Sequence, residues 1–215
     1  MDSNVGFQIS LNIQGRSCLV LGGEEEAVEK IDRILESGGK VTVVNPTLHT
    51  TLRKYTASGK IIHRGRTFRT TDVQNGVAVV VNTVVNDHEL AKQLYELAKT
   101  ERFLVWSIDQ PDLSTITMPA LVKRGPVRVA ISTSGASPSL AKAMRKDLEI
   151  LLDEEFGECV EWLGAVRNEM RKTESNEKVR RKRLQQLIEG FRLTGTIEYP
   201  RAWQEQQMSQ QVKEA

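Results

Sequence analysis

The chain has 215 residues, of which 39% are hydrophobic and 27% charged, enough for one core of ordinary size and a smaller second element but too few for a large multidomain enzyme. Thirty Lys and Arg against 28 Asp and Glu leave a net charge of +2, which excludes the global positive field of a dedicated nucleic-acid-binding protein. Cys18 and Cys159 lie too far apart for a disulfide scaffold or a metal-binding motif, so we expect reduced thiols.

The first residues and the apolar runs of the sequence indicate the expected cellular compartment. The first residues lack the basic start and apolar run of a signal peptide, and no stretch reaches the roughly 20 apolar residues of a membrane span. The basic run 180–183 has glutamates nearby and is interpreted as a solvated helix face. We therefore expect a cytoplasmic protein with neither nucleic acid nor membrane as a partner.

The first half of the chain alternates short apolar strands with helices. An apolar run at 18–21 leads into Gly22-Gly23 and a segment whose apolar residues recur at helical spacing up to Gly38-Gly39, and a β-branched strand follows at 41–44. Two such strands joined by a helix form a βαβ unit with a right-handed parallel crossover. Further strands are predicted at 60–63, 77–81 and 103–108, and a helix at 89–99. We expect a parallel sheet covered by helices.

The pattern changes after residue 112. Two β-rich runs, 114–120 and 127–132, are separated by a turn at 123–126 and predict a hairpin or a sheet extension. From Ser137 onward the sequence is helical, because Ser137 can cap a helix and Pro138 suits its first turn. Leu140, Met144, Leu148, Leu151 and Leu152 form the apolar face of this helix. Further helices are predicted at about 154–171 and 177–191, before a polar tail that frays.

The glycine pair after the first strand has two interpretations. In dinucleotide-binding folds this turn holds the pyrophosphate with free N–H groups and the positive end of the helix. Here Glu24, Glu25 and Glu26 follow directly, and these acids favour the helix through its dipole but would repel a bound pyrophosphate. The alternative is a plain strand-to-helix turn. Asn45 stands where a carboxylate would bind a ribose hydroxyl, so the choice between NAD and NADP stays open.

Three segments in order resemble one known family. They are the strand and turn at 19–23, the segments 107–111 and 117–120, and the Ser-Gly-x-Ser-Pro-x-Leu-Ala motif within 131–141. Together they resemble the precorrin-2 dehydrogenase family, the dehydrogenase and ferrochelatase part of siroheme synthases, over about residues 8–192. The resemblance implies an α/β fold with an N-terminal Rossmann-like parallel sheet, a small central β-containing dimerisation region and a helical C-terminal region.

The resemblance also implies a domain organisation and an activity. We expect a Rossmann-like NAD-binding domain at 1–112, a central dimerisation region with the Ser-Gly loop at 113–140, a helical domain at 141–200 and a flexible polar tail at 201–215. Members of the family oxidise precorrin-2 to sirohydrochlorin with NAD, and some also insert ferrous iron to give siroheme. The implied partners are these tetrapyrroles and a second copy of the chain.

The resemblance places the family's functional aspartate at Asp109. This residue follows a strand, and ligands of open α/β sheets bind beyond the carboxyl ends of strands. A carboxylate there can act as general base on the macrocycle or take pyrrole protons during metal insertion. From the residues alone, the alternative is a side chain that forms the turn before Gln110-Pro111.

The predicted binding residues fall into two groups. Between residues 113 and 146 the chain has six basic residues and no acidic one, a charge suited to a substrate with many carboxylates. We predict no resident metal, because the three histidines lack ligand spacing. The predicted substrate-binding residues are Lys123, Arg124, Arg128, Ser132, Ser134, Gly135 and Ser137, and the predicted cofactor-binding residues are Gly22, Gly23, Glu24, Asn45, Pro46 and Thr83.

The chain departs from the family pattern in the cofactor half. Glu24 and Glu26 stand where members have a third glycine and an apolar residue, and in 82–86 only Thr83 matches the usual run after the buried strand. These departures keep an alternative open: a member with a defective NAD site that acts only as a chelatase or as a non-catalytic tetrapyrrole-binding protein.

Overall fold

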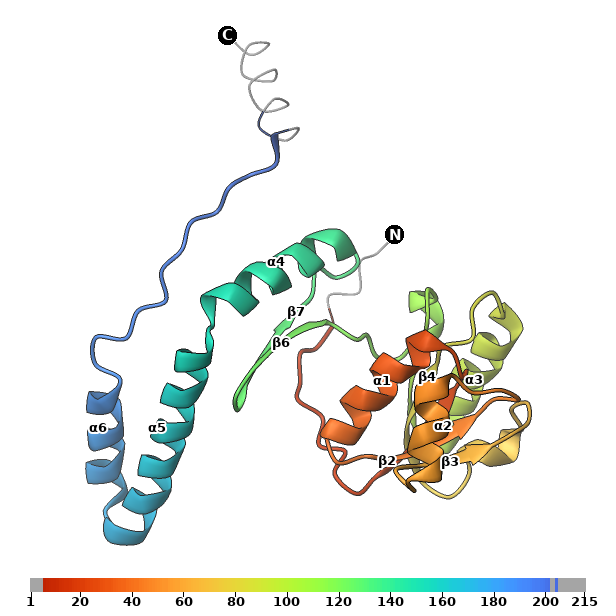
Figure 1. Cartoon of the computed structure of the whole chain (residues 1–215), viewed down its shortest axis with the longest axis horizontal. Coiled ribbons are helices and arrows are strands. Elements are labelled where there is room, and N and C mark those ends of the chain that lie inside the picture. Colours follow the sequence, from red (N-terminus) through yellow and green to blue (C-terminus); the bar gives the residue numbers. More distant parts are fainter. Residues whose placement is uncertain (1–5, 202–203, 205–215) are drawn as a thin grey trace. The chain divides into compact units, whose positions relative to one another are not determined.

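A computed structural model of the chain describes residues 6–201 and residue 204. The chain divides into two compact units, one made of Met1–Val122 and Arg128–Leu151 and the other of Lys123–Val127 and Leu152–Ala215. The first unit holds the five-stranded sheet and the second the last two helices (Figure 1). The division into domains that the sequence predicts stays a prediction.

The sheet of the first unit is parallel throughout, as predicted. Its strand order is β3-β2-β1-β4-β5, so the chain starts in the middle, builds outward to one edge and then returns to build the other half (Figure 1). This is the order of a Rossmann fold, and it confirms the predicted fold class. The strands are β1 (Ser17–Leu21), β2 (Lys40–Val44), β3 (Ile61–Arg64), β4 (Val77–Asn82) and β5 (Leu104–Ser107).

Two apolar clusters cover the two faces of the sheet. Cys18 and Val20 of β1 point into one cluster with α1 (Glu25–Glu36), whereas Leu19 and Leu21 point into the other with α3 (His88–Glu101). Successive side chains of a strand alternate between faces, so a strand buried on both sides is apolar at every position. Burial raises the pKa of the Cys18 thiol to about 11, which keeps it protonated in the core.

The sequence analysis did not predict α2 (Thr50–Ala57), which joins β2 to β3. The helix is short, and only Leu52 is buried. It begins at His49, whose Nδ1 accepts a hydrogen bond from the Thr51 N–H at 3.3 Å. The sheet topology could have predicted this helix, because two parallel strands need a connection of about a dozen residues or more, and this connection is usually helical.

The predicted strand at 114–120 is wrong for residues 114–119. The Thr115 hydroxyl accepts from the Val105 N–H at 2.9 Å, and the Thr115 N–H donates to the Val105 carbonyl at 2.8 Å. A side chain therefore replaces one backbone partner, and Pro119 has no N–H to continue a ladder. The small sheet consists of β6 (Ala120–Arg124) and β7 (Val127–Ile131), so Lys123 and Arg124 belong to a strand rather than to the turn.

The predicted helices of the C-terminal third are present. They are α4 (Pro138–Leu151), α5 (Glu154–Thr173) and α6 (Glu177–Leu187), and α6 ends four residues before the predicted end at 191. In the second unit, α5 and α6 pack side by side (Figure 1). Within the described ranges no helix has the length and apolar content needed to cross a membrane. The predicted fraying of the tail concerns residues that lie mostly outside the described ones.

An ionic cluster holds the segment after β3. Arg66 donates two hydrogen bonds to the Asp72 carboxylate, at 2.7 and 2.6 Å, Arg64 donates a third, and the Arg69 N–H a fourth at 2.9 Å. The Asp72 side chain is 1% exposed, and the hydrogen bond from Arg66, the largest cause, lowers its pKa to about 2. Asp72 is therefore charged at neutral pH and ties β3 to the short helix η1 (Thr70–Val73).

Candidate functional site

The topological switch point of the sheet lies where β1 and β4 end side by side. Their helices leave toward opposite faces of the sheet, and ligands of open α/β sheets bind at the carboxyl ends of two such strands. Gly22 follows β1 with φ of 101°, and Thr83 follows β4. The Thr83 hydroxyl donates to the Leu21 carbonyl at 2.9 Å, and a Cβ on Gly22 would lie 2.2 Å from that hydroxyl oxygen. Gly22 therefore allows the two strand ends to meet.

The second glycine joins the end of β1 to the end of β2. A Cβ on Gly23 would lie 2.2 Å from the Thr47 carbonyl oxygen and 2.9 Å from the Asn45 amide nitrogen. That amide donates to the Thr47 carbonyl at 2.8 Å, and the His49 N–H donates to the Gly23 carbonyl at 2.6 Å. The structure thus brings together Gly22, Gly23, Asn45 and Thr83, with Pro46 exposed beside them.

We expect Gly23→Ala to distort this junction, because its new methyl group would collide with backbone. Overpacking of this kind costs about 1–3 kcal/mol of folding free energy. Thermal unfolding measures the loss, and Gly164→Ala is the control, since that glycine lies in α5 with nothing within 4 Å of the added Cβ. Equal melting temperatures for Gly23→Ala and the wild type would contradict the close contact.

The start of α1 offers backbone donors to an anion. Glu24 is the residue before the helix, and its side chain caps nothing. Within residues 6–201, the backbone N–H groups of Glu24, Glu25 and Glu26 donate to no acceptor. Free N–H groups at a helix N-terminus fit a pyrophosphate, so the residues present suit a dinucleotide.

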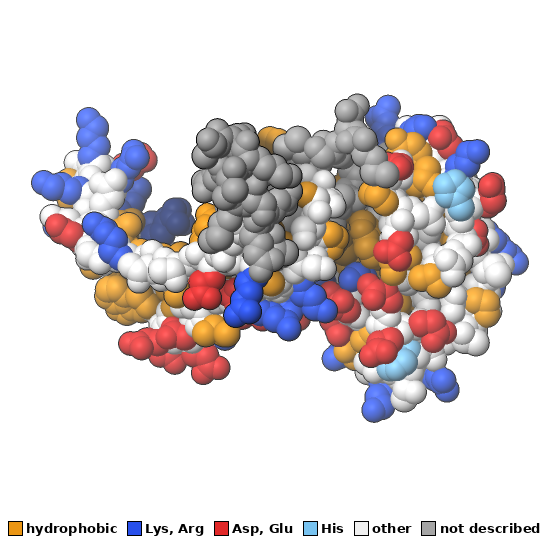
Figure 2. Space-filling model, turned by 90° about the horizontal axis from the view of Figure 1, so that it is seen from above, with side chains coloured by type: hydrophobic (Ala, Val, Ile, Leu, Met, Phe, Trp, Pro, Cys, Tyr) orange, Lys and Arg blue, Asp and Glu red, His pale blue; other side chains and the backbone are white. Residues whose placement is uncertain are grey.

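The three glutamates of this turn are not equivalent. The Glu26 carboxylate lies 2.9 Å from the Lys30 ammonium, which also sits 5.4 Å from the centre of the Trp106 ring and is buried. Lys30 also lies 3.2 Å from the Glu29 carboxylate, so it compensates the charge of Glu26 in part. All three glutamates are exposed, and Glu24 and Glu25, which form no ion pair within the described residues, oppose a phosphate most. Figure 2 shows many Asp and Glu side chains on the visible face of the part that carries the five-stranded sheet.

Asp109 follows β5 at the same edge of the sheet, in a left-handed conformation with φ of 54°. Its turn is held by other groups: the Gln110 N–H donates to the Ser107 carbonyl at 3.3 Å, and the Ser114 hydroxyl donates to the Gln110 carbonyl at 2.9 Å. In the described part of the chain the exposed Asp109 carboxylate accepts no hydrogen bond. It is therefore available to a substrate.

Asn82 is a site residue that the sequence analysis did not single out. It is fully buried at the end of β4, its amide donates to the Ser107 hydroxyl at 3.4 Å, and its side-chain oxygen accepts from the Val84 N–H at 3.1 Å. Its backbone carbonyl accepts from the Ile108 N–H at 2.9 Å. Asn82 thus fixes the end of β5 from which Asp109 projects.

The Ser-Gly loop precedes α4. The Ser137 hydroxyl accepts from the Leu140 N–H at 3.2 Å and so caps the helix, as predicted, while the Ser132 hydroxyl accepts from the Ser134 N–H at 3.2 Å. Ser134 and Gly135 have φ of 50° and 84°, and nothing lies within 4 Å of a Cβ on Gly135. Ser134 and Gly135 form the open part of the loop.

The predicted basic residues lie on the two strands of the small sheet. Lys123 and Arg124 lie in β6 and Arg128 lies in β7. The Arg124 Nε donates to the Leu152 carbonyl, which gives that guanidinium a structural contact. Binding of a substrate by these residues stays a prediction.

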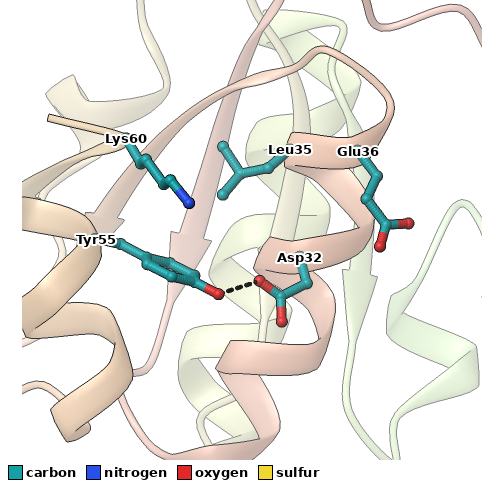
Figure 3. A pocket seen from close by; sticks show the side chains of 5 residues that line it. All are labelled: Asp32, Leu35, Glu36, Tyr55 and Lys60. Atoms are coloured by element: carbon teal, nitrogen blue, oxygen red, sulfur yellow. Dashed lines mark hydrogen bonds between the residues drawn. The ribbon is translucent and has the colours of Figure 1, made fainter. Parts of the chain in front are cut away.

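A separate hollow of about 450 Å³ lies between α1 and α2 (Figure 3). Tyr55 donates a hydrogen bond to Asp32 at 2.9 Å, which raises the pKa of the phenol, and the Lys60 ammonium lies 5.1 Å from the centre of the Tyr55 ring. Lys60 precedes β3, so this hollow is at the amino ends of the strands, opposite the edge where ligands bind. Among the described residues no three His, Cys, Asp or Glu side chains gather as a metal site.

The sheet order, the paired glycines and the free helix N-terminus define a Rossmann dinucleotide-binding domain. Residues 9–120 match a family model described as putative NAD(P)-binding, and residues 124–150 match one described as sirohaem biosynthesis protein central. The chain belongs to this NAD(P)-binding family, which confirms the resemblance stated from the motifs and the predicted nicotinamide dinucleotide.

Similar proteins extend the comparison. A siroheme synthase of Nitrosococcus oceani is 33% identical over 182 residues, which are 85% of this chain and 38% of the relative. A siroheme synthase of Nitrosospira multiformis is 31% identical over 214 residues, 96% of this chain and 45% of the relative. The chain therefore spans less than half the length of these relatives. The solved structure of SirC, a precorrin-2 dehydrogenase, has the same fold, with a TM-score of 0.72 and 24% identity over 98% of this chain and 100% of that one.

Proposed function

We propose that the chain oxidises precorrin-2 to sirohydrochlorin with NAD, and that Asp109 is the general base. The observation that carries the proposal is an exposed carboxylate without a partner in the described residues, at the same sheet edge as the turn of an NAD(P)-binding domain. The names of the siroheme synthase relatives and of the precorrin-2 dehydrogenase with the same fold support the choice of substrate.

Each part of the site has a role in this reaction. The oxidation removes two electrons and two protons, and NAD supplies the acceptor for the hydride that carries both electrons and one proton. The Asp109 carboxylate takes the second proton. The N–H groups at the start of α1 hold the pyrophosphate, while Arg128 and the Ser134–Gly135 loop bind the carboxylates of the tetrapyrrole.

A turnover assay under anaerobic conditions tests this proposal. The purified chain, supplied with precorrin-2 and NAD, should develop the absorbance of sirohydrochlorin, and the same mixture without NAD should not. If sirohydrochlorin appears in neither mixture, but the protein accelerates insertion of ferrous iron into added sirohydrochlorin, the chain is a chelatase and the proposed oxidation is wrong.

The exposed carboxylates at the start of α1 favour a second candidate function. In this candidate the chain no longer binds NAD and acts as a chelatase or a tetrapyrrole-binding protein.

We expect Glu24→Gln to tighten NAD binding about two- to fivefold, because one charge near a helix N-terminus changes the free energy by about 0.3–1 kcal/mol. Glu26→Gln should change the affinity less, since Lys30 already compensates Glu26 in part. Calorimetric titration of both variants measures the difference, and equal effects would contradict the pairing.

We further propose that the active form is a cytoplasmic homodimer. The predicted apolar face of α4 is partly open, with Leu140 51% and Met144 and Leu151 each 42% exposed. Apolar side chains grouped in this way mark an interaction surface. Sedimentation of the purified chain should give the mass of a dimer, and Met144→Glu should shift it to the mass of a monomer.

A further inference from the structure

We infer that residues 7–13 add a β-strand to the small sheet of a second copy of this chain, so that two copies exchange these segments. The inference rests on the homodimer proposed above and specifies a part of the chain that joins the two copies. It starts from the segment before β1, which the single chain leaves outside every helix and strand.

The segment 7–13 has the side-chain pattern of a strand. Apolar and polar side chains alternate over its seven positions, and none of them is charged. Because successive side chains of a strand point to opposite faces, this segment would present one apolar face and one polar face. Such alternation is typical of a strand that is buried on one side. The apolar residues are Phe7, Ile9, Leu11 and Ile13, and the polar residues are Gln8, Ser10 and Asn12.

The apolar face of the segment is covered at one end and open along the rest. Ile13 packs against the core cluster that α1 forms with the five-stranded sheet. By contrast, Phe7, Ile9 and Leu11 are 89%, 64% and 46% exposed. Large apolar side chains grouped on one exposed face mark a surface that another protein surface covers.

The backbone of the segment is also unpaired. Within the described part of the chain, the N–H and carbonyl groups of residues 7–11 form no hydrogen bond. None of residues 7–13 has a positive φ, so their backbone is compatible with a strand. Backbone pairing begins at Gly15, whose N–H donates to the Gly38 carbonyl at 2.8 Å. A segment with free donors and acceptors and one apolar face suits addition to the edge of a sheet.

The small sheet has edges that can accept a strand. In the described residues it consists of β6 and β7, so each strand has one side without a neighbouring strand. A sheet of two strands has little stability of its own in water, and a third strand strengthens it. Leu121 of β6 and Val129 of β7 are half-buried, which leaves apolar surface for contact with an added strand.

A second copy, rather than the same chain, supplies the added strand. Arg33, in the last turn of α1, donates to the Pro119 carbonyl at 3.4 Å directly before β6, and a Cβ on Gly39 would contact both Ile13 and Ile34. The segment and the small sheet are thus both attached near the end of α1, yet they form no pair within the single chain.

An exchange between two copies makes the same contact twice. In a two-fold dimer, the segment of each copy lies on the small sheet of the other, and both apolar faces are covered. The partly open face of α4, which we assign to the homodimer, follows β7 in the chain. The exchanged strand therefore continues the proposed interface.

Ile9→Glu and Ser10→Glu form a matched pair that tests the inference without an activity assay. Both add the same charge at neighbouring positions, but in a strand the two side chains point to opposite faces. We expect Ile9→Glu to weaken dimerisation about tenfold or more, because the dimer would bury the new charges, and Ser10→Glu to change it by less than about twofold. Sedimentation over a range of protein concentrations measures both dissociation constants. Equal effects of the two variants, or a dimer that Ile9→Glu does not weaken, would overturn the inference.

Hydrogen exchange of the full chain shows whether the segment forms a strand. Every second amide of residues 7–13 should exchange about tenfold or more slowly in the dimer than after dilution to the monomer, since an edge strand bonds to its neighbour through alternate residues. Fast exchange in the dimer would overturn the inference and leave the homodimer standing. Slow exchange at every concentration would show pairing within one chain and would also overturn it. A wild type that stays monomeric would overturn both the inference and the homodimer, whereas the turnover assay judges the proposed oxidation separately.

Discussion

Asp109→Asn is expected to lower the rate of NAD-dependent sirohydrochlorin formation by about 10²–10⁴-fold, the usual contribution of a general base. The amide has almost the shape of the carboxylate but cannot take the proton that the oxidation releases. Asparagine also tolerates the left-handed backbone at this position, where φ is 54°, so the fold should be kept. Steady-state rates with precorrin-2 measure the effect, and thermal unfolding verifies that the variant is folded.

A matched variant separates the role of Asp109 from a general loss of negative charge. Asp112→Asn removes a carboxylate from η2 (Pro111–Leu113), three residues along the chain and also exposed. It should leave kcat within about twofold. Because Asp109 acts in the chemical step, its variant should lose kcat with little change of KM. Near-normal turnover of Asp109→Asn would remove this residue from catalysis.

Asp72→Ala is expected to lower the free energy of unfolding by about 2–3 kcal/mol, the contribution at neutral pH of a carboxylate whose pKa falls from 3.8 to about 2 on folding. The substitution leaves Arg64 and Arg66 without the carboxylate that they share, and it releases η1 from β3. Urea denaturation at neutral pH measures the change. Glu96→Gln, which removes a partner of Lys99 from an exposed pair at 2.7 Å, is the control and should have little effect.

The same cluster predicts the pH dependence of stability. The pKa of Asp72 is lowered from 3.8 to about 2, so the folded state favours the charged form. The stabilisation from this group is fully present above its unfolded pKa and is lost as the pH falls toward 2. The stabilities of the wild type and Asp72→Ala should therefore converge between these two values. A gap that stays constant down to pH 2 would show that Asp72 acts through packing and not through its charge.

Most of the fold could be predicted because its signals are local. A strand buried on both faces must be apolar at each position, and β1 and β4 have this pattern. The short α2 lacks such a signal, since its stability comes from Leu52 packing into the core rather than from its own periodicity. The error at 114–119 has the same origin: only the fold shows that the Thr115 hydroxyl takes the place of a backbone partner.

The part of the site that could be predicted from the sequence is the part that follows directly after apolar strands. Gly22-Gly23 and Asp109 stand directly after apolar strands, where parallel topology places ligands. The pairing of Glu26 with Lys30 was available from their spacing of four residues, but was not used. The burial of Asn82 depends on its contact with Ser107, which is distant in sequence and becomes a neighbour only when the chain is folded.

A single turnover with the protein in excess over precorrin-2 tests the central claim most directly. One reduced dinucleotide should form for each sirohydrochlorin, because the two electrons that leave the macrocycle have no other acceptor. The two products should also appear at the same rate. Sirohydrochlorin formed without reduced dinucleotide would contradict the account, because the electrons would have gone to another acceptor. No conversion by a protein shown to bind both ligands would also contradict it, and would favour a chelatase or a tetrapyrrole-binding protein.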